Sequence, residues 1–302
     1  MTETVTPGRP VLAPGLHPLE DPSGQVQFGL EPPHRHRVPN TPAVRRVLEI
    51  LGRGEALPDV PEIRTARRLL APVLRDGDTL VRPGVDPAEV AAVTLRHPLS
   101  AAARLAARQD ARIEVRGSLG PDVAALVAAV GLGRTDDKAG SASATPPSAV
   151  LLLSRGEADR DELDVLSARA IPHLLVRAVE SEIVVGPFVV PGTTSCVRCL
   201  DLHRTTAEPS YGSLLGARLR ADRHDGVVEP VDAALAWVAL GWAVTDLVRY
   251  AEGERPSTWS ATVRLDGSPG PVGTEHQRPH PDCSCTWTAM SGGWDGSVTM
   301  EV

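Results

Sequence analysis

The hydrophobic pattern of the first eighty residues predicts a small module of strands and helices. The pattern predicts a short apolar strand at residues 26–30, and Thr41 followed by Pro42 predicts the start of a helix that ends near Gly52. The apolar face of this helix comprises Val44, Val47, Leu48 and Leu51. A second helix is predicted after it, followed by a tight turn and a strand at residues 79–81. The apolar face of this second helix comprises Ile63, Ala66, Leu69, Leu70 and Leu74. We therefore predict a winged-helix-like module over residues 16–83 and a linker or helical segment over residues 84–110.

From residue 111 onwards, strands alternate with helices. A strand and glycine turn at residues 113–120 precede a helix at 123–130, and the run at 149–153 is apolar enough for a fully buried strand. Further elements are predicted at residues 159–170, 173–176, 182–190, 231–250 and 258–265. This alternation predicts an α/β domain over residues 111–290 with a mainly parallel sheet, followed by a tail at 291–302.

Composition and charge narrow the classes of function. The chain has 302 residues, 42% of them hydrophobic, and a formal net charge of -7, which disfavours a protein that coats nucleic acid or an anionic membrane. The apolar run at 231–250 is interrupted by Asp232 and Asp246 and predicts a buried helix, with Trp237 and Trp242 in the core or on a docking face. With no export signal at the N-terminus, we expect a cytoplasmic protein without membrane contact.

Four cysteines form the most informative pattern. Cys196-Val197-Arg198-Cys199 can present two thiolates to one metal ion, and Cys283-Ser284-Cys285 can supply the other two ligands of a tetrahedral zinc site. In a reducing compartment, metal binding or free thiols are favoured over disulfides. The first pair alone would also fit a redox function, and His276 or His280 could replace one cysteine.

Several motifs resemble a known family. Gly186-Pro187-Phe188, the segment from Gly192 to Arg204 and His280-Pro281-Asp282-Cys283-Ser284-Cys285 resemble the ThiF/MoeB-like proteins of azole-forming peptide (TOMM) and bacteriocin biosynthesis. These are the cyclodehydratase partner, or leader-peptide-binding, proteins. The resemblance covers most of the chain and is strongest from about residue 183 to 285.

The resemblance implies a ThiF-like, Rossmann-type domain with a four-cysteine zinc site. It also implies that the N-terminal module, as a RiPP recognition element, grips the leader of a ribosomal precursor peptide. The partner would be a YcaO-type cyclodehydratase that carries out the ATP-dependent cyclisation to azolines. The chain itself would then be a non-catalytic subunit, and homodimerisation is a further implication.

The residues for catalysis by this chain are incomplete. Gly117 and Gly120 remain from a nucleotide-binding glycine turn, no acidic ribose partner is evident, and the sole lysine, Lys138, lies in a polar loop. If all four cysteines bind zinc, no thiol remains for a thioester. We therefore expect no catalytic residues and regard ATP as doubtful, although arginine could replace lysine on the phosphates.

Two alternatives stay open. An ATP-dependent adenylyltransferase that activates the C-terminus of a peptide or carrier protein would use the same fold. A DNA-binding regulator is the weaker alternative, because residues 1–83 hold 11 arginines against 10 acidic residues and no nucleic acid partner is expected.

Overall fold

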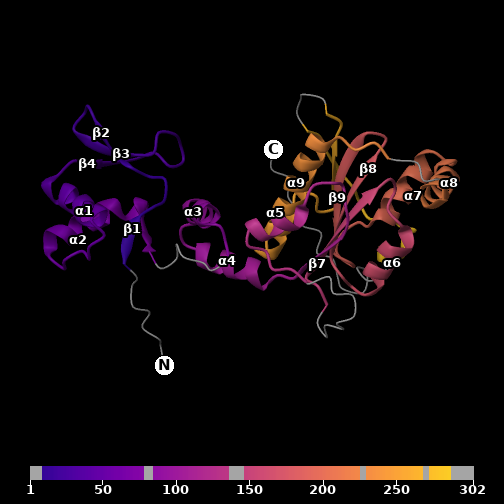
Figure 1. Ribbon diagram of the computed structural model, residues 1–302, viewed down its shortest axis with the longest axis horizontal. Coiled ribbons are helices and arrows are strands. Elements are labelled where there is room, and N and C mark those ends of the chain that lie inside the picture. Colours follow the sequence, from indigo (N-terminus) through magenta and orange to yellow (C-terminus); the bar gives the residue numbers. More distant parts are fainter. Residues whose placement is uncertain (1–8, 78–83, 136–145, 225–228, 268–271, 287–302) are drawn as a thin grey trace. The chain divides into compact units, whose positions relative to one another are not determined.

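The protein divides into two compact units. A computed structural model describes residues 9–77, 84–135, 146–224, 229–267 and 272–286 (Figure 1). The first unit comprises residues 1–106 and 129–131, and the second comprises residues 107–128 and 132–302. The predicted strand at 79–81, Lys138 and the predicted tail lie outside the described residues. In the described part of the chain, no helix is both long and apolar enough to cross a membrane.

The first unit combines two small antiparallel sheets with helices. Strands β2 (Pro18–Asp21), β3 (Gln25–Phe28) and β4 (His36–Pro39) form one sheet in that order, and β1 (Pro10–Leu12) pairs with β5 (Leu74–Asp76). The helices are α1 (Pro42–Gly52), α2 (Pro61–Leu70), η1 (Ala71–Val73), α3 (Pro87–Arg96) and α4 (Ala101–Asp110), which crosses the boundary between the units. Phe28, Val44 and Leu70 are fully buried in the core of this unit.

Helix α1 shows how local sequence determines structure here. The Thr41 side chain accepts a hydrogen bond from the backbone N–H of Val44 at 3.2 Å, and Pro42 occupies the first turn, which confirms the predicted start. The helix buries Val44, Val47 and Ile50. The predicted face of the next helix is wrong at its end, because Leu69 is 40% exposed and Leu74 lies in β5.

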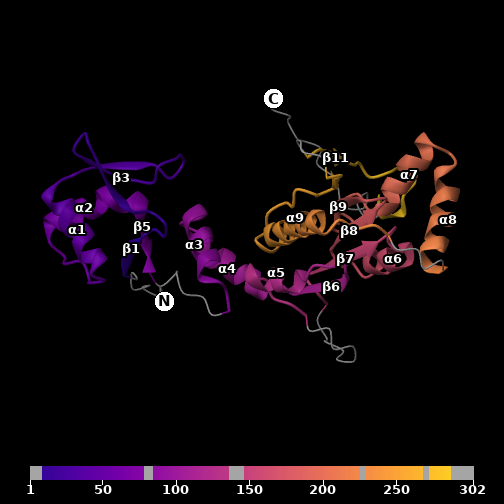
Figure 2. The same ribbon diagram turned by 45° about the horizontal axis from the view of Figure 1, so that its top comes forward.

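The second unit contains a six-stranded sheet with the order β11-β10-β9-β8-β7-β6. Its strands are β6 (Ile113–Gly117), β7 (Ala149–Arg155), β8 (His173–Val179), β9 (Glu182–Val189), β10 (Ala261–Leu265) and β11 (Thr274–His276). The helices are α5 (Val123–Ala129), α6 (Arg160–Ala168), α7 (Val197–Ala207), α8 (Tyr211–His224), α9 (Ala233–Ala251) and η3 (Ser284–Thr286). Figures 1 and 2 show α9 on one face of the sheet and α6 on the other.

The prediction of a mainly parallel sheet is wrong, because the sheet is mixed. Strands β6, β7 and β8 are parallel, whereas β8–β9, β9–β10 and β10–β11 pair antiparallel. Only Glu180 and Ser181 separate β8 from β9, and both have positive φ angles, 54° and 67°. Such a two-residue turn reverses the chain into a hairpin and excludes the crossover that parallel pairing needs.

Candidate metal centre

The first cysteine pair is presented by the start of α7. Cys196 is the N-cap residue of this helix and Cys199 lies in its first turn, so both side chains face the same side. The loop between β9 and α7 is closed by Thr194, whose hydroxyl accepts from the N–H of Val190 at 2.8 Å. The backbone N–H groups at a helix start also favour thiolate over thiol.

The second pair lies at the end of the described chain. Cys283 is 2% exposed, and its N–H donates to the carbonyl of His280 at 3.0 Å. Cys285 belongs to the short helix η3 and is half-buried. The preceding strand β11 pairs with β10, which brings this segment back to the second unit.

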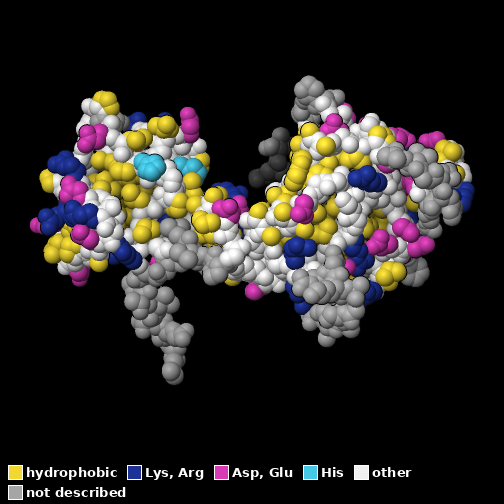
Figure 3. Space-filling model, in the orientation of Figure 1, with side chains coloured by type: hydrophobic (Ala, Val, Ile, Leu, Met, Phe, Trp, Pro, Cys, Tyr) yellow, Lys and Arg dark blue, Asp and Glu magenta, His cyan; other side chains and the backbone are white. Residues whose placement is uncertain are grey.

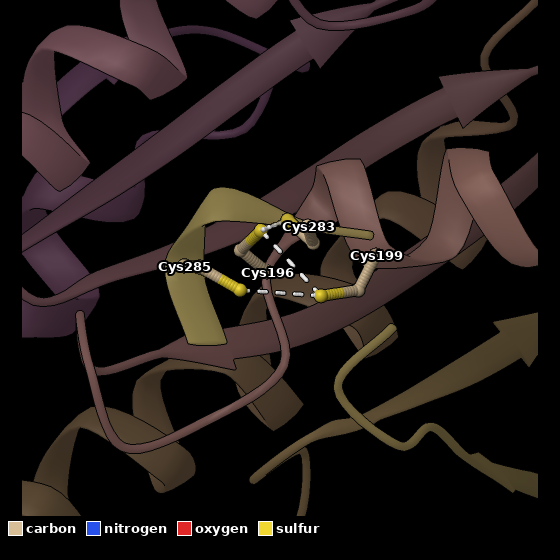
Figure 4. Close-up of side chains that lie close together, drawn as sticks. All are labelled: Cys196, Cys199, Cys283 and Cys285. Carbon is tan, nitrogen blue, oxygen red and sulfur yellow. Dashed lines mark hydrogen bonds between the residues drawn. The ribbon is translucent and has the colours of Figure 1, made fainter. Parts of the chain in front are cut away.

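The four sulfur atoms converge on one point (Figure 4). All of them lie within 4.8 Å of one another. The Sγ–Sγ distances are 3.3 Å for Cys199 and Cys285, 3.6 Å for Cys196 and Cys283, and 3.9 Å for Cys196 and Cys199. Zinc–sulfur bonds of about 2.3 Å in a tetrahedron place the sulfurs about 3.8 Å apart. The cluster therefore has the donor atoms and the spacing that suit a tetrahedral metal ion.

Without a cation, the cluster cannot hold four thiolates. Hydrogen bonds from the thiols of Cys196 and Cys285 hold the pKa of Cys199 well below its usual value. The same contact with Cys199 raises the pKa of Cys196 to about 12, and the neighbouring thiols and burial raise the pKa of Cys285 as well. The cluster thus favours one thiolate, at Cys199, and opposes the ionisation of further thiols. A divalent cation would offset the repulsion between several thiolates.

Largely buried ion pairs fix α7 against its neighbours. Arg160 at the start of α6 donates to both carboxylate oxygens of Asp201 on α7, at 2.9 and 3.0 Å. The Glu157 carboxylate accepts from Arg160 at 2.9 Å and from Arg177 of β8 at 3.1 Å. Sequence reasoning missed this network, because only folding brings β8, α6 and α7 together. Asp201, two residues after Cys199, stands inside the motif that carries the family resemblance.

Neither histidine considered from the sequence joins the cysteines. His280 is buried, but its Nδ1 accepts from the N–H of Asp282 at 3.1 Å and its Nε2 lies 3.4 Å from the Thr206 hydroxyl. His276 is an exposed residue of β11. Among the described residues, the candidate metal cluster consists of cysteines alone.

The predicted nucleotide turn lies at the carboxyl end of β6. Gly117 has φ +78°, and a Cβ there would clash with the carbonyl oxygen of Leu153, so backbone packing is a sufficient reason for this glycine. Gly120 borders a cavity of about 410 Å³, whose charged lining residues in the described chain are Arg155 and Glu229. The described part of the cavity lining therefore carries no net positive charge to offset phosphates.

Comparison with solved structures shows which fold this is. The heterocyclase TruD matches with a TM-score of 0.60 and 18% identity over 93% of this chain, and MccB of E. coli matches with a TM-score of 0.54 and 11% identity over 92%. The chain spans 43% of the TruD chain and 99% of MccB. The chain therefore shares the fold of the heterocyclase TruD and of MccB.

The same fold occurs in several complexes. A heterocyclase solved in complex with substrate and cofactor has a TM-score of 0.60 at 19% identity, over 93% of this chain and 40% of its own. The Microcin C7 biosynthetic enzyme MccB, in complex with N-formylated MccA, has a TM-score of 0.53 at 11% identity, over 92% of this chain and 99% of its own. No family model and no curated protein matches the sequence.

Proposed function

We propose that Cys196, Cys199, Cys283 and Cys285 bind one structural zinc ion. Four thiolates would complete a tetrahedral shell and leave no position open for water or substrate, which is the arrangement of structural zinc sites. Soft sulfur ligands also disfavour calcium and magnesium. The ion would join the segment after β11 to the start of α7 and thereby close the second unit.

We further propose that the chain is a non-adenylating scaffold. In this function it binds the leader of a ribosomal precursor peptide and presents the peptide to a YcaO-type cyclodehydratase for azoline formation. The observation that carries this choice is the cavity beside Gly120, whose described lining holds a single arginine, Arg155, together with the acidic Glu229. Adenylation needs cations around the triphosphate, and the described lining of this cavity supplies one arginine.

The first unit offers an edge where a peptide could add as a strand. Strands β2 and β4 are the outer strands of their sheet among the described residues. β2 begins with Pro18 and carries an exposed Glu20, whereas β4 carries His36 and an exposed Arg37. Strand addition uses backbone hydrogen bonds for affinity and side chains for specificity. Proline has no backbone N–H to donate, and in β4 it stands only at the last position, Pro39. We therefore assign the peptide to the edge of β4.

The comparisons support a peptide-related function at the level of fold. MccB was solved together with MccA and a heterocyclase together with its substrate, and this chain shares the fold across both of its units. The second candidate is ATP-dependent adenylation of a peptide or carrier-protein C-terminus. It is favoured by one observation, a complex of MccB with AMPCPP and MccA, which matches with a TM-score of 0.50 and 12% identity over 91% of this chain and 99% of its own.

Calorimetry on the full chain distinguishes the two candidates. We expect binding of precursor-type peptides encoded by the neighbouring genes, no binding of Mg-ATP, and no peptide-dependent pyrophosphate exchange. Arg37→Glu should weaken peptide binding about tenfold or more, because it reverses a charge on the assigned edge. The matched control is Arg53→Glu, which reverses another exposed charge of the first unit, at the end of α1. ATP binding with exchange would instead establish the adenylyltransferase, and equal effects of both variants would exclude the β4 edge.

A further inference from the structure

Helix α6 contributes no cysteine to the metal centre, but it packs against the turn that carries two of them. Helical spacing places Cys196 and Cys199 on one side of the first turn of α7 and the two residues between them, Val197 and Arg198, on other sides. Val197 is 3% exposed and belongs to one apolar cluster with Leu163 of α6. The turn that presents the cysteines to the second pair (Figure 4) is thus held from behind by α6.

Two ion pairs of opposite polarity join the same two helices. Arg160 of α6 donates to both carboxylate oxygens of Asp201 on α7, at 2.9 and 3.0 Å. In the other direction, Arg198 of α7 donates through Nε to Oδ1 of Asp164 on α6 at 2.6 Å, and its Nη2 also donates to Oδ2. Each helix therefore supplies one arginine and one aspartate, about one turn apart. On α7, these two residues stand on either side of Cys199 in the sequence.

The opposite polarity of the two pairs selects one position of α7. A shift of α7 by one turn along α6 would bring Asp201 to Asp164, or Arg198 to Arg160, and the repulsion between like charges opposes both shifts. Packing restricts α7 as well, because α6 and the cysteine turn enclose a cavity of only about 10 Å³ between them. Such a cavity has room for no more than about one water molecule. The helix therefore has little freedom to rotate against α6.

The orientation of α7 matters because this helix carries half of the metal ligands. Any rotation of α7 moves the sulfurs of Cys196 and Cys199 together, relative to those of Cys283 and Cys285. A binding site works only when its groups are held within about 0.5 Å of the required geometry. Residues that fix α7 should therefore control how well the four sulfurs fit one ion.

From these observations we infer that α6 positions the metal ligands. Arg160, Asp164, Arg198 and Asp201 form a charge clamp that holds α7 in the orientation in which its two cysteines complete the zinc site. The inference rests on the proposed zinc site. The four residues are positioning residues, because none of them belongs to the candidate metal cluster. Substitution of residues that orient metal ligands typically weakens metal binding about 10–100-fold.

The more exposed pair of the charge clamp is suited to an experimental test. The side chains of Arg198 and Asp164 are 55% and 39% exposed, and exposed ion pairs contribute little to folding. Figure 3 shows acidic and basic side chains close together on the second unit, over the region of α6. The zinc dissociation constant of the full chain is measured by competition with a chelator. We expect Arg198→Asp and Asp164→Arg each to raise it at least about tenfold. The double variant, which exchanges the two charges, should return it to within about threefold of the original value.

The two single variants separate positioning from a direct effect of charge on the ion. Four thiolates around one zinc ion carry a net negative charge, so an added arginine nearby favours metal binding and an added aspartate opposes it. A direct effect therefore predicts opposite changes for Asp164→Arg and Arg198→Asp, whereas positioning predicts that both weaken binding. The melting temperature of the metal-free chain should stay the same in both variants, which a merely structural role of the pair would not allow.

Arg249→Asp is the matched control. Arg249 forms an ion pair with Glu254 in the second unit, and their side chains are 45% and 38% exposed. This variant should leave the zinc dissociation constant unchanged. Tighter binding by Asp164→Arg, or a double variant as weak as the single ones, would overturn the charge clamp and leave the zinc site standing. An unaltered chain that binds no zinc would overturn the zinc site itself, so the two failures are distinguishable.

Discussion

Removal of zinc should destabilise the second unit and leave the first unchanged. All four cysteines belong to the second unit, and the segment after β11 contributes two of them. Chelation would leave the four thiols in contact without a cation. Cys285→Ser removes one ligand and keeps the size of a half-buried side chain. Both perturbations should release the Cys283 segment from the start of α7.

The size of the effect follows from the affinity of such sites. Structural zinc binding to four protein ligands contributes about 10 kcal/mol or more, which corresponds to dissociation constants of tens of nanomolar or below. Free zinc at about 100 times that constant stabilises the folded state by about 2.7 kcal/mol. For a domain of this size, about 1 kcal/mol shifts the melting temperature by about 2–4 °C. We therefore expect the melting temperature of the second unit to fall by at least about 5–10 °C.

Elemental analysis and calorimetric unfolding provide the assay. We expect one zinc per chain, and loss of zinc should shift only the transition that belongs to the second unit, so the first unit serves as an internal reference. Ser284→Ala is the matched variant, because Ser284 is an exposed residue between two ligands. A chain that contains no zinc, or whose unfolding is unaffected by a strong chelator and by Cys285→Ser, would refute the reasoning.

Three further perturbations test the packing around the two units. Leu70→Ala should destabilise the first unit by about 2–5 kcal/mol in urea unfolding, whereas Leu69→Ala next to it should cost far less, because Leu70 is fully buried and Leu69 is 40% exposed. Burial alone would raise the pKa of Glu157, but Arg177 and Arg160 outweigh it and hold that pKa below the ordinary 4.5. Its contribution to stability is therefore complete above pH 4.5 and is lost as the pH falls through the lowered value, so Glu157→Gln should flatten the acid limb of a stability-against-pH curve. Gly117→Ala should yield little folded protein in circular dichroism, because φ +78° and the nearby backbone oxygen both oppose a side chain.

The elements that the sequence predicted well have local causes. The cap at Thr41 and the apolar spacing after it define α1 without reference to the rest of the chain. The apolar run at residues 149–153 likewise indicated a fully buried strand, and all five residues are buried in β7. The two cysteine pairs were recognisable because metal ligands have characteristic spacing, and their convergence is now seen in the structure. Their occupation by zinc stays a prediction.

The elements that were missed depend on distant partners. Leu74 was predicted to continue a helical face, but Leu74–Asp76 pairs with Pro10–Leu12, more than sixty residues earlier. The direction of β9 depends on the two-residue turn at Glu180 and Ser181, which carries none of the asparagine or glycine residues that usually mark such turns. Neither feature could be read from a short window of sequence.

The sequence by itself determined which residues could bind metal, where helix α1 begins, and that the second half alternates strands with helices. Only the tertiary structure decided that the sheet is mixed, that Arg160 and Arg177 share the buried carboxylate of Glu157, and that α9 presents Trp237 to solvent. The physical reason is the distance along the chain over which each interaction acts. Capping, helix propensity and ligand spacing act within a few residues, whereas strand pairing, burial of charge and the exposure of a helix face depend on which distant segments pack against each other.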